Sequence, residues 1–246
     1  MAFIELLLIF AAGIIGGVYG TLVGAGNVLT IPLMIFLGIP VHETIAANRF
    51  GTIGLVGTGY YKFQKKKLVN HKIGLFIAFF AAIGSYFGTK LVLSVDARIL
   101  EKIISSVIIA LLSLTLFNKN IGLEAKRVGK RHMLMGSFAS LLLGAYIGFM
   151  GLAAGTFLIY LAVMVFGQTF LQSAGTIKIP GGIASLISAI IFWLNGKIIW
   201  SFAIVLFASY SIGSYIGAHY SDRIGNVWLR RMFIAVSAVM ALTLLF

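Results

Sequence analysis

The sequence predicts an all-α polytopic membrane protein made of two inverted repeats, each with four to five transmembrane segments and with broken or re-entrant helices. Of its 246 residues, 60% are hydrophobic and only 10% are charged, whereas a soluble domain needs roughly 25% charged residues to cover its surface. Glycine, at 29 residues, is enriched as in membrane bundles, where small residues let helices approach closely. Apolar runs also recur in the same order in both halves of the chain.

A membrane-spanning helix needs about 20 mostly apolar residues. Such runs lie at 3–39, 44–61, 73–93, 103–117, 133–166, 170–194, 199–218 and 228–246. The first and fifth runs are double length, so each is either two spans or a re-entrant hairpin. The predicted domains are a first transmembrane repeat at 1–117, a basic cytoplasmic linker at 118–132 and a second transmembrane repeat at 133–246. The first twenty residues lack a basic start and a cleavage site, which indicates a retained helix.

The two halves align without gaps when the sequence is shifted by a constant 129 residues. The shift places the segment IGSY at 83–86 on IGSY at 212–215, and Gly38 on Gly167. It also places Arg49 on Lys178, one cation on another inside otherwise uncharged segments. This self-similarity over the whole length predicts a duplicated helical unit.

The distribution of basic residues predicts the orientation of the halves. If the halves are inverted, loops 62–72, 118–132 and 219–231 share one side and hold 13 basic residues, against three on the other side. Parallel halves would give 11 and five. Because cytoplasmic loops carry the excess of lysine and arginine, we expect inverted halves with both termini outside the cytoplasm.

Several classes of function are disfavoured by the composition. The net charge of +13 lies mainly in short loops, so we interpret it as a topology signal and as contacts with the lipid bilayer, not with nucleic acid. Cysteine is absent, which excludes disulfides and thiolate chemistry. The apolar segments hold no phosphate-binding loop, no cluster of metal ligands and no Ser/His pair, so we expect no enzyme activity, no cofactor and no metal.

Glycine-rich stretches at 20–27 and 148–156 are the expected helix breaks. The 129-residue shift places Asn27 on Thr156 and Gly26 on Gly155. Helix breaks of this kind present free N–H groups and the positive ends of half-helices to anions. We therefore predict that Asn27, Thr156, Gly24, Gly26 and Gly155 contribute to an anion site. Close helix packing is the alternative, since Gly16, Gly20 and Gly24 are spaced by four.

Arg49 and Lys178 are the predicted charges of that site. A cation deep in a bilayer costs on the order of 3 kcal/mol, so such residues usually face the interior of the bundle. Asn48 and Thr176 lie close to them in sequence and could hydrogen-bond an oxyanion. With no carboxylate well inside an apolar run, an anionic substrate is the expected partner of the two cations. The alternative is snorkelling of both long side chains to the interface.

Four stretches of the chain are informative together: VGAGN and LTIP within 23–32, HETIAANRFGTI at 42–53, AGTIKIPGG at 174–182 and SLISAIIFWLNGKIIW at 185–200. In these stretches the chain resembles the sulfite exporter (TauE/SafE) family of membrane transporters. The family often has an asparagine a few residues after the lysine, where this chain has Gly181 and Gly182.

The resemblance implies a secondary transporter of sulfite, an organosulfonate or another small sulfur-containing anion, working by alternating access. Its location would be the cell membrane as a multi-pass protein, the plasma membrane of a prokaryote, and a homo-oligomer is compatible with the sequence. The alternative is a non-transporting membrane scaffold or regulatory protein, for which paired buried cations have no purpose.

Overall fold

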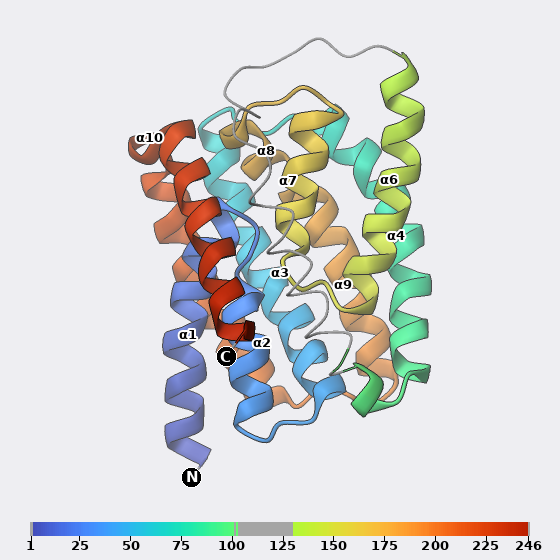
Figure 1. The fold of residues 1–246 in the computed structure, drawn as a ribbon, viewed down its shortest axis with the longest axis vertical. Helices are drawn as coiled ribbons and strands as arrows, with labels where there is room; N and C mark the ends of the chain where they lie inside the picture. Colours follow the sequence, from blue (N-terminus) through green and yellow to red (C-terminus); the bar gives the residue numbers. More distant parts are fainter. Residues whose placement is uncertain (1, 101, 103–129, 246) are drawn as a thin grey trace.

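The structure, a computed structural model, describes residues 2–100, 102 and 130–245 (Figure 1). The expected segment 103–117 and most of the linker 118–132 therefore lie outside the described residues. The described part is helical and contains no strand, which confirms the all-α class. Its helices are α1 (Ala2–Leu22), α2 (Asn27–Phe36), α3 (Val41–Lys65), α4 (His71–Ser94), α6 (Lys130–Phe149), α7 (Ala154–Met164), α8 (Phe170–Thr176), α9 (Lys178–Leu194) and α10 (Trp200–Leu245).

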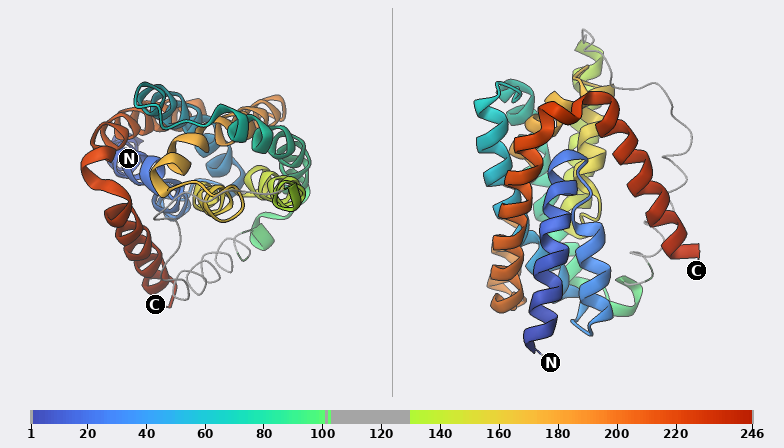
Figure 2. Two further views of the ribbon diagram at one scale, coloured as in Figure 1. Left: turned by 90° about the horizontal axis from the view of Figure 1, so that it is seen from above. Right: turned by 90° about the vertical axis from the view of Figure 1, so that its left-hand side faces the viewer.

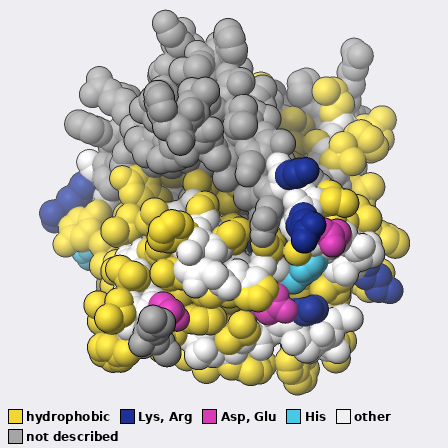
Figure 3. Space-filling view, turned by 60° about the horizontal axis from the view of Figure 1, so that its bottom comes forward, with side chains coloured by type: hydrophobic (Ala, Val, Ile, Leu, Met, Phe, Trp, Pro, Cys, Tyr) yellow, Lys and Arg dark blue, Asp and Glu magenta, His cyan; other side chains and the backbone are white. Residues whose placement is uncertain are grey.

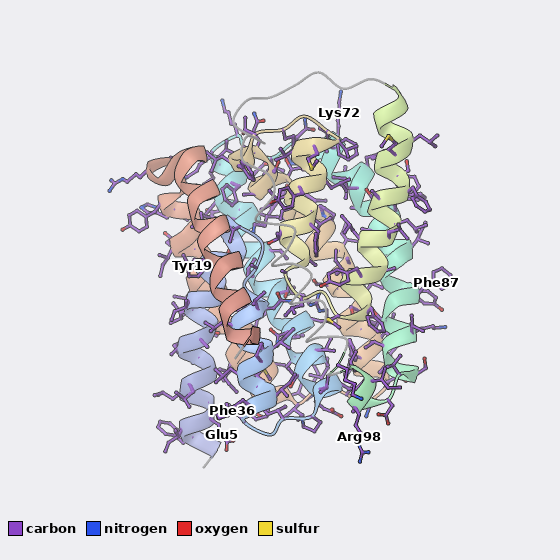
Figure 4. The ribbon with its side chains drawn as sticks, viewed as in Figure 1. Glu5, Tyr19, Phe36, Lys72, Phe87 and Arg98 are labelled. Carbon is purple, nitrogen blue, oxygen red and sulfur yellow. The ribbon has the colours of Figure 1, made fainter. Side chains whose placement is uncertain are left out.

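Four segments are long and apolar enough to cross a membrane: 3–22, 71–94, 170–194 and 200–223. Large apolar side chains on their outer faces are exposed, including Phe79 at 64% and Phe87 at 63%, as a bilayer environment allows. Phe87 points away from the bundle in Figure 4. Seen from the end that carries the N-terminus, a few charged side chains lie on a mainly apolar surface (Figure 3).

The two double-length runs are hairpins. Helices α2 and α7 have only 10 and 11 residues, which at about 1.5 Å per residue cover about half of a 30 Å hydrocarbon core. Each follows a long helix, α1 or α6, and returns toward the end from which that helix came (Figure 1). The turns α1–α2 and α6–α7 therefore meet toward the middle of the molecule, as re-entrant segments do.

The helices of the two halves correspond at the 129-residue shift. Helix α1 matches α6, α2 matches α7, α3 matches α8 and α9 together, and α4 matches the first part of α10, residues 200–223. Helix α3 is continuous, whereas its counterpart is interrupted at Ile177 because Pro180 has no N–H to donate to the carbonyl of Thr176. Helices α1 and α6 run in opposite directions in Figure 1, as inverted halves require.

Left-handed backbone residues occupy equivalent positions in the two halves. Gly38 and Gly167 have φ of 81° and 64°, Lys67 and Gly196 have 56° and 66°, and Gly24 and Ala153 have 81° and 52°. Residues with a Cβ atom rarely adopt this left-handed backbone conformation. Three pairs of turn positions thus share a left-handed backbone, even where glycine occurs in only one half, whereas Gly151, with φ of 61°, has the helical Leu22 as its counterpart.

The halves are interlocked through their first and fourth helices. Helix α4 packs along α6 of the other half, and α10 packs along α1. The repeated IGSY segments contribute close contacts, since a Cβ at Gly84 would collide with the carbonyl of Leu141 and one at Gly213 with that of Ile14. Beyond the bundle, the C-terminal part of α10 turns back and descends apart from the other helices (Figure 2).

Charged contacts define the two ends of the bundle. Lys66 forms an ion pair with Asp222 at 2.6 Å and donates to the carbonyl of His219 at 2.9 Å, so segments 62–72 and 219–222 share one end. The segment 219–231, expected to be a loop, is part of helix α10. Lys197 pairs with Glu43 at 3.3 Å at the opposite end. Figure 4 places Lys72 and Arg98 at these two ends, and we call them the Lys72 end and the Arg98 end. The described loops are grouped as the positive-inside count predicted.

We expect the Lys72 end to face the cytoplasm. The native chain has no cysteine, so Lys72→Cys and Arg98→Cys each introduce a single thiol at an exposed position. An impermeant maleimide added to intact cells should label position 98, and should label position 72 only after the membrane is opened. Labelling of both positions from the same side would contradict this arrangement.

Candidate functional site

The two helix breaks enclose a central cavity. Helix α1 ends at Leu22 and α2 begins at Asn27, while α6 ends at Phe149 and α7 begins at Ala154. The interruptions expected near Gly24–Asn27 and Gly151–Thr156 are thus confirmed. The cavity between them has a volume of about 60 Å³, room for a few water molecules or one small ion.

Six of the nine predicted site residues line this cavity. They are Gly24, Gly26, Asn27, Arg49, Gly155 and Lys178. Both halves contribute, although these residues lie as far as 154 positions apart in the sequence. The structure therefore brings together the two cations and the two breaks that the sequence singled out.

The glycines also provide close backbone packing. A Cβ on Gly155 would lie 2.7 Å from the Cα of Gly24, and one on Gly26 would lie 3.0 Å from the Cα of Gly20. Gly24 additionally needs its left-handed conformation, with φ of 81°. Packing and cavity lining are therefore both properties of these glycines.

The two cations make equivalent contacts across the halves. The guanidinium of Arg49 on α3 donates from Nη2 to the carbonyl of Met150 at 3.1 Å. The Nζ of Lys178 at the start of α9 donates to the carbonyls of Thr21 at 3.2 Å and Gly20 at 3.3 Å. Thr21 and Met150 are themselves equivalent, being 129 residues apart. Each cation thus binds the end of the long hairpin helix of the opposite half.

This contact has a clear electrostatic basis. The last carbonyls of a helix have no intrahelical donor and form the negative end of its dipole. Arg49 and Lys178 are only 2% and 3% exposed, so these carbonyls are their immediate partners. The snorkelling alternative is wrong, because both side chains turn inward. Main-chain oxygens thus partly satisfy both cations, a role that the sequence had led us to assign to an anionic substrate alone.

Donors remain on both cations. The Nε of Arg49 is buried and has no hydrogen-bond partner among the described residues, and a buried unpaired donor is costly. None of the four acids in the described residues lines the cavity. Glu43 and Asp222 pair with lysines at the two ends of the bundle. Among the described residues, the lining of the cavity therefore holds two basic side chains and no acidic one.

Asn27 and Thr156 connect the breaks to each other. The Nδ2 of Asn27 donates to the carbonyl of Gly151 at 2.6 Å, and its Oδ1 accepts from the amide of Ala153 at 3.0 Å. In the opposite direction, Thr156 Oγ1 donates to the carbonyl of Val23 at 2.7 Å. Asn27 lines the cavity, whereas Thr156 is buried behind it.

Asn48 and Thr176 do not line the cavity. Asn48 Oδ1 accepts from Thr30 Oγ1 at 2.6 Å and from the hydroxyl of Tyr210 at 2.9 Å. Thr176 Oγ1 accepts from the amide of Asn70 and from Gln168 Nε2, both at 3.1 Å. Asn48 holds Tyr210, which does line the cavity; Thr176 holds the loop between α3 and α4. Direct contact of either with a substrate stays a prediction.

Sequence reasoning missed three polar residues that line the cavity: Thr52, Ser185 and Tyr210. Thr52 follows Arg49 by one helical turn on α3, so the 3.6-residue period could have indicated it. No signal marked Tyr210, whose counterpart at the 129-residue shift is Ala81. Gly181, where the related family often has asparagine, does line the cavity but offers no side chain.

Comparison with known proteins agrees with this architecture. The described helices define a multi-pass membrane protein, and residues 9–244 match the sulfite exporter TauE/SafE family. The chain belongs to this family, and with its relatives this indicates a membrane transporter. No solved structure matches the chain.

The curated relatives cover nearly the full chain. A probable membrane transporter protein of Haemophilus influenzae is 27% identical over 96% of this chain and 92% of its own. The probable membrane transporter protein YfcA of Escherichia coli K12 is 26% identical over 97% and 88%. YdhB of Bacillus subtilis, with the same description, is 26% identical over 98% and 99%.

The bridge made by Asn27 should be important for stability. Asn27→Leu removes the partners of the Gly151 carbonyl and the Ala153 amide, and we expect a loss of about 2–4 kcal/mol of folding free energy, since each buried unpaired group costs about 1–3 kcal/mol. Thermal unfolding of the purified protein in detergent measures it. The control is Asn195→Ala, an exposed asparagine that bonds only within its own helix, which should change little. Equal unfolding temperatures for both variants would contradict the bridging role.

Proposed function

We propose that the protein is a secondary transporter of a small anion, bound in the central cavity between Arg49 and Lys178. The observation that carries this proposal is the pairing of two buried basic side chains, one from each half, in a cavity lined by no acid of the described residues. The family description, sulfite exporter, supports sulfite as the anion, and the proposal extends to an organosulfonate or another sulfur-containing anion. The relatives named above are bacterial, which supports a place in a prokaryotic plasma membrane.

Backbone geometry supports an anionic ligand as well. Helices α2 and α7 both begin at the cavity, at Asn27 and at Ala154. The N-terminus of a helix carries free N–H groups and the positive end of the dipole, which favour anions. Discontinuous helices of this kind bind substrates near the midplane of secondary transporters. The small volume of the cavity favours an ion of few atoms.

A second feature supports alternating access. A groove of about 420 Å³ lies between α3, α4 and α9 toward the Lys72 end. Tyr60 and His71 line it, and Val56 and Lys178 line both the groove and the central cavity. We propose this groove as the route from the Lys72 end to the site.

Aromatic side chains cluster in the equivalent region at the Arg98 end, where Trp200 and Phe207 are 45% and 39% exposed. The counterparts of Ile179 and His71, both groove residues, are Phe50 and Trp200. Their rings lie 5.3 Å apart edge to face, and Phe207 packs on Phe50 at 5.6 Å. We call Phe50, Trp200 and Phe207 the aromatic plug. In an alternating-access cycle, this structure would be the conformation in which the site is accessible from the Lys72 end.

A non-transporting scaffold remains the second candidate, because the crosswise contacts give both cations a structural partner. Arg49→Gln and Lys178→Gln separate the two functions. Glutamine keeps an N–H donor but carries no charge, and it is shorter than arginine or lysine. We expect folded variants whose anion flux into proteoliposomes falls at least tenfold. Sulfite, methanesulfonate and thiosulfate are the anions to test.

Lys90→Gln is the matched control, since Lys90 is an exposed lysine that contacts Tyr86 on the outer face of α4. Its flux should match that of the parent. If the double variant Arg49→Gln/Lys178→Gln transports at near the parental rate, the anion site is wrong. If the parent moves none of the three anions, the scaffold is favoured.

The aromatic plug should control access from the Arg98 end. With Ser185→Cys as the reporter in the cavity, we expect an impermeant thiol reagent to reach it only from the Lys72 end. Phe50→Ala removes the ring that joins Trp200 to Phe207, so labelling from the Arg98 end should rise several-fold. The control Phe87→Ala alters a lipid-facing ring and should leave labelling unchanged. No change with Phe50→Ala would show that another element closes this end.

A further inference from the structure

We propose that Lys178 takes up one proton when the anion binds and releases it when the anion leaves, so that the protein carries a proton together with its anion. This inference rests on the proposed anion site. It assigns Lys178 a second task, coupling, that Arg49 cannot perform.

The number of hydrogen-bond acceptors around Lys178 matches the neutral amine but is one too few for the ammonium form. Two main-chain oxygens among the described residues accept from its Nζ, those of Gly20 and Thr21. A neutral amine has two N–H donors, and these two carbonyls satisfy both. The ammonium form has three donors, so it needs one more acceptor. An anion in the cavity supplies this acceptor, and it also favours the added positive charge.

The comparison with Arg49 isolates the property that matters. Both cations occupy equivalent positions and bind equivalent carbonyls, so an arginine at 178 would meet the structural need of that contact. Arginine stays protonated in proteins, whereas lysine can lose its proton when it is buried. The site therefore combines one permanent cation with one titratable cation.

The surroundings of Lys178 leave it as the proton carrier of the site. Arg49 from α3 and Tyr210 from α10 line the same cavity, and Tyr60 from α3 and His71 from α4 line the adjoining groove. The α1 atoms that bind Nζ are carbonyl oxygens, and the Phe63 ring of α3 lies 5.9 Å away. No carboxylate from the part of the chain that the structure describes lines either space. His71 bonds Tyr60 at 3.1 Å and is the competing candidate.

The proton balance is simple. A proton from water in the groove binds the lone pair of Nζ, and the ammonium then holds the anion with its third N–H. When the cavity opens to the other end, the anion leaves, and the same proton passes from Nζ to water on that side. One proton and one anion thus move in the same direction. By linkage, protonation and anion binding strengthen each other by the same factor.

Calorimetry of the purified full-length protein tests this. Methanesulfonate and thiosulfate are suitable probes because they stay fully ionised from mildly acidic to alkaline pH. Titrations in two buffers with different ionisation heats count the protons taken up per anion. We expect the count to rise with pH from near zero to about one. Over the upper range, the affinity should fall about tenfold per pH unit, as binding coupled to one proton requires.

Two variants separate Lys178 from its neighbours. Lys178→Arg should bind the anion with no proton uptake and with an affinity that hardly changes with pH. His71→Gln should keep the proton uptake of the parent. If Lys178→Arg does not fold, parental uptake that persists in His71→Gln supports the proposal.

Three results would overturn it. Anion binding by the parent without proton uptake would leave the anion site intact but remove the coupling. Uptake that persists in Lys178→Arg, or that vanishes in His71→Gln, would assign the proton to another group. Failure of the parent to bind either anion would overturn the coupling and, with it, the anion site for these probes.

Discussion

The structure depends on one constraint: a helix that breaks inside a bilayer must satisfy its freed main-chain groups without bulk water. Two breaks lie near the middle of this protein, and each frees carbonyls at the end of a long helix. The carbonyls of Thr21 and Met150 receive donors from Lys178 and Arg49, and the hydrogen bonds of Asn27 and Thr156 join the turns. In every case the donor comes from the other half of the chain.

The same constraint explains why a binding site arises at this place. Freed N–H groups, helix ends and cations gather where the breaks meet, so the polar atoms of the bundle are concentrated around one cavity. The structural contacts use only part of the donor capacity of the cations, as the unpaired Nε of Arg49 indicates. The same side chains thus stabilise the fold and would bind the ligand. Variants that keep a hydrogen-bond donor but lose the charge are needed to test the two roles separately.

Much of this arrangement could be predicted from the sequence. Glycine patterns located both breaks, and the 129-residue shift paired Arg49 with Lys178 before any geometry was known. The shift could not say whether residues 3–39 form two spans or a hairpin, because length alone fits both. The decision lies in turns at Gly24 and Ala153, where a left-handed residue reverses the chain after one long helix.

Contacts between elements were the part that sequence could not supply. Asn48 and Thr176 lie next to or near the cations in the chain, yet a helix turns successive residues by about 100°, so their side chains point to other neighbours. Tyr210 lines the cavity from α10, and no pattern in the sequence of α10 marks this residue as functional. Main-chain carbonyls are absent from any residue pattern, which is why the partners of the two cations emerged only with the fold.

The crosswise contacts of Arg49 and Lys178 also bear on movement. Each side chain belongs to one half and donates to a main-chain carbonyl of the other, so each half needs the other to satisfy the carbonyls at its helix break. Any rocking of the halves must therefore turn about these contacts or exchange them in step. A ligand held between the two cations would lie close to the rotation axis, where atoms move least. The groove and the aromatic plug lie farther from that axis and would move most.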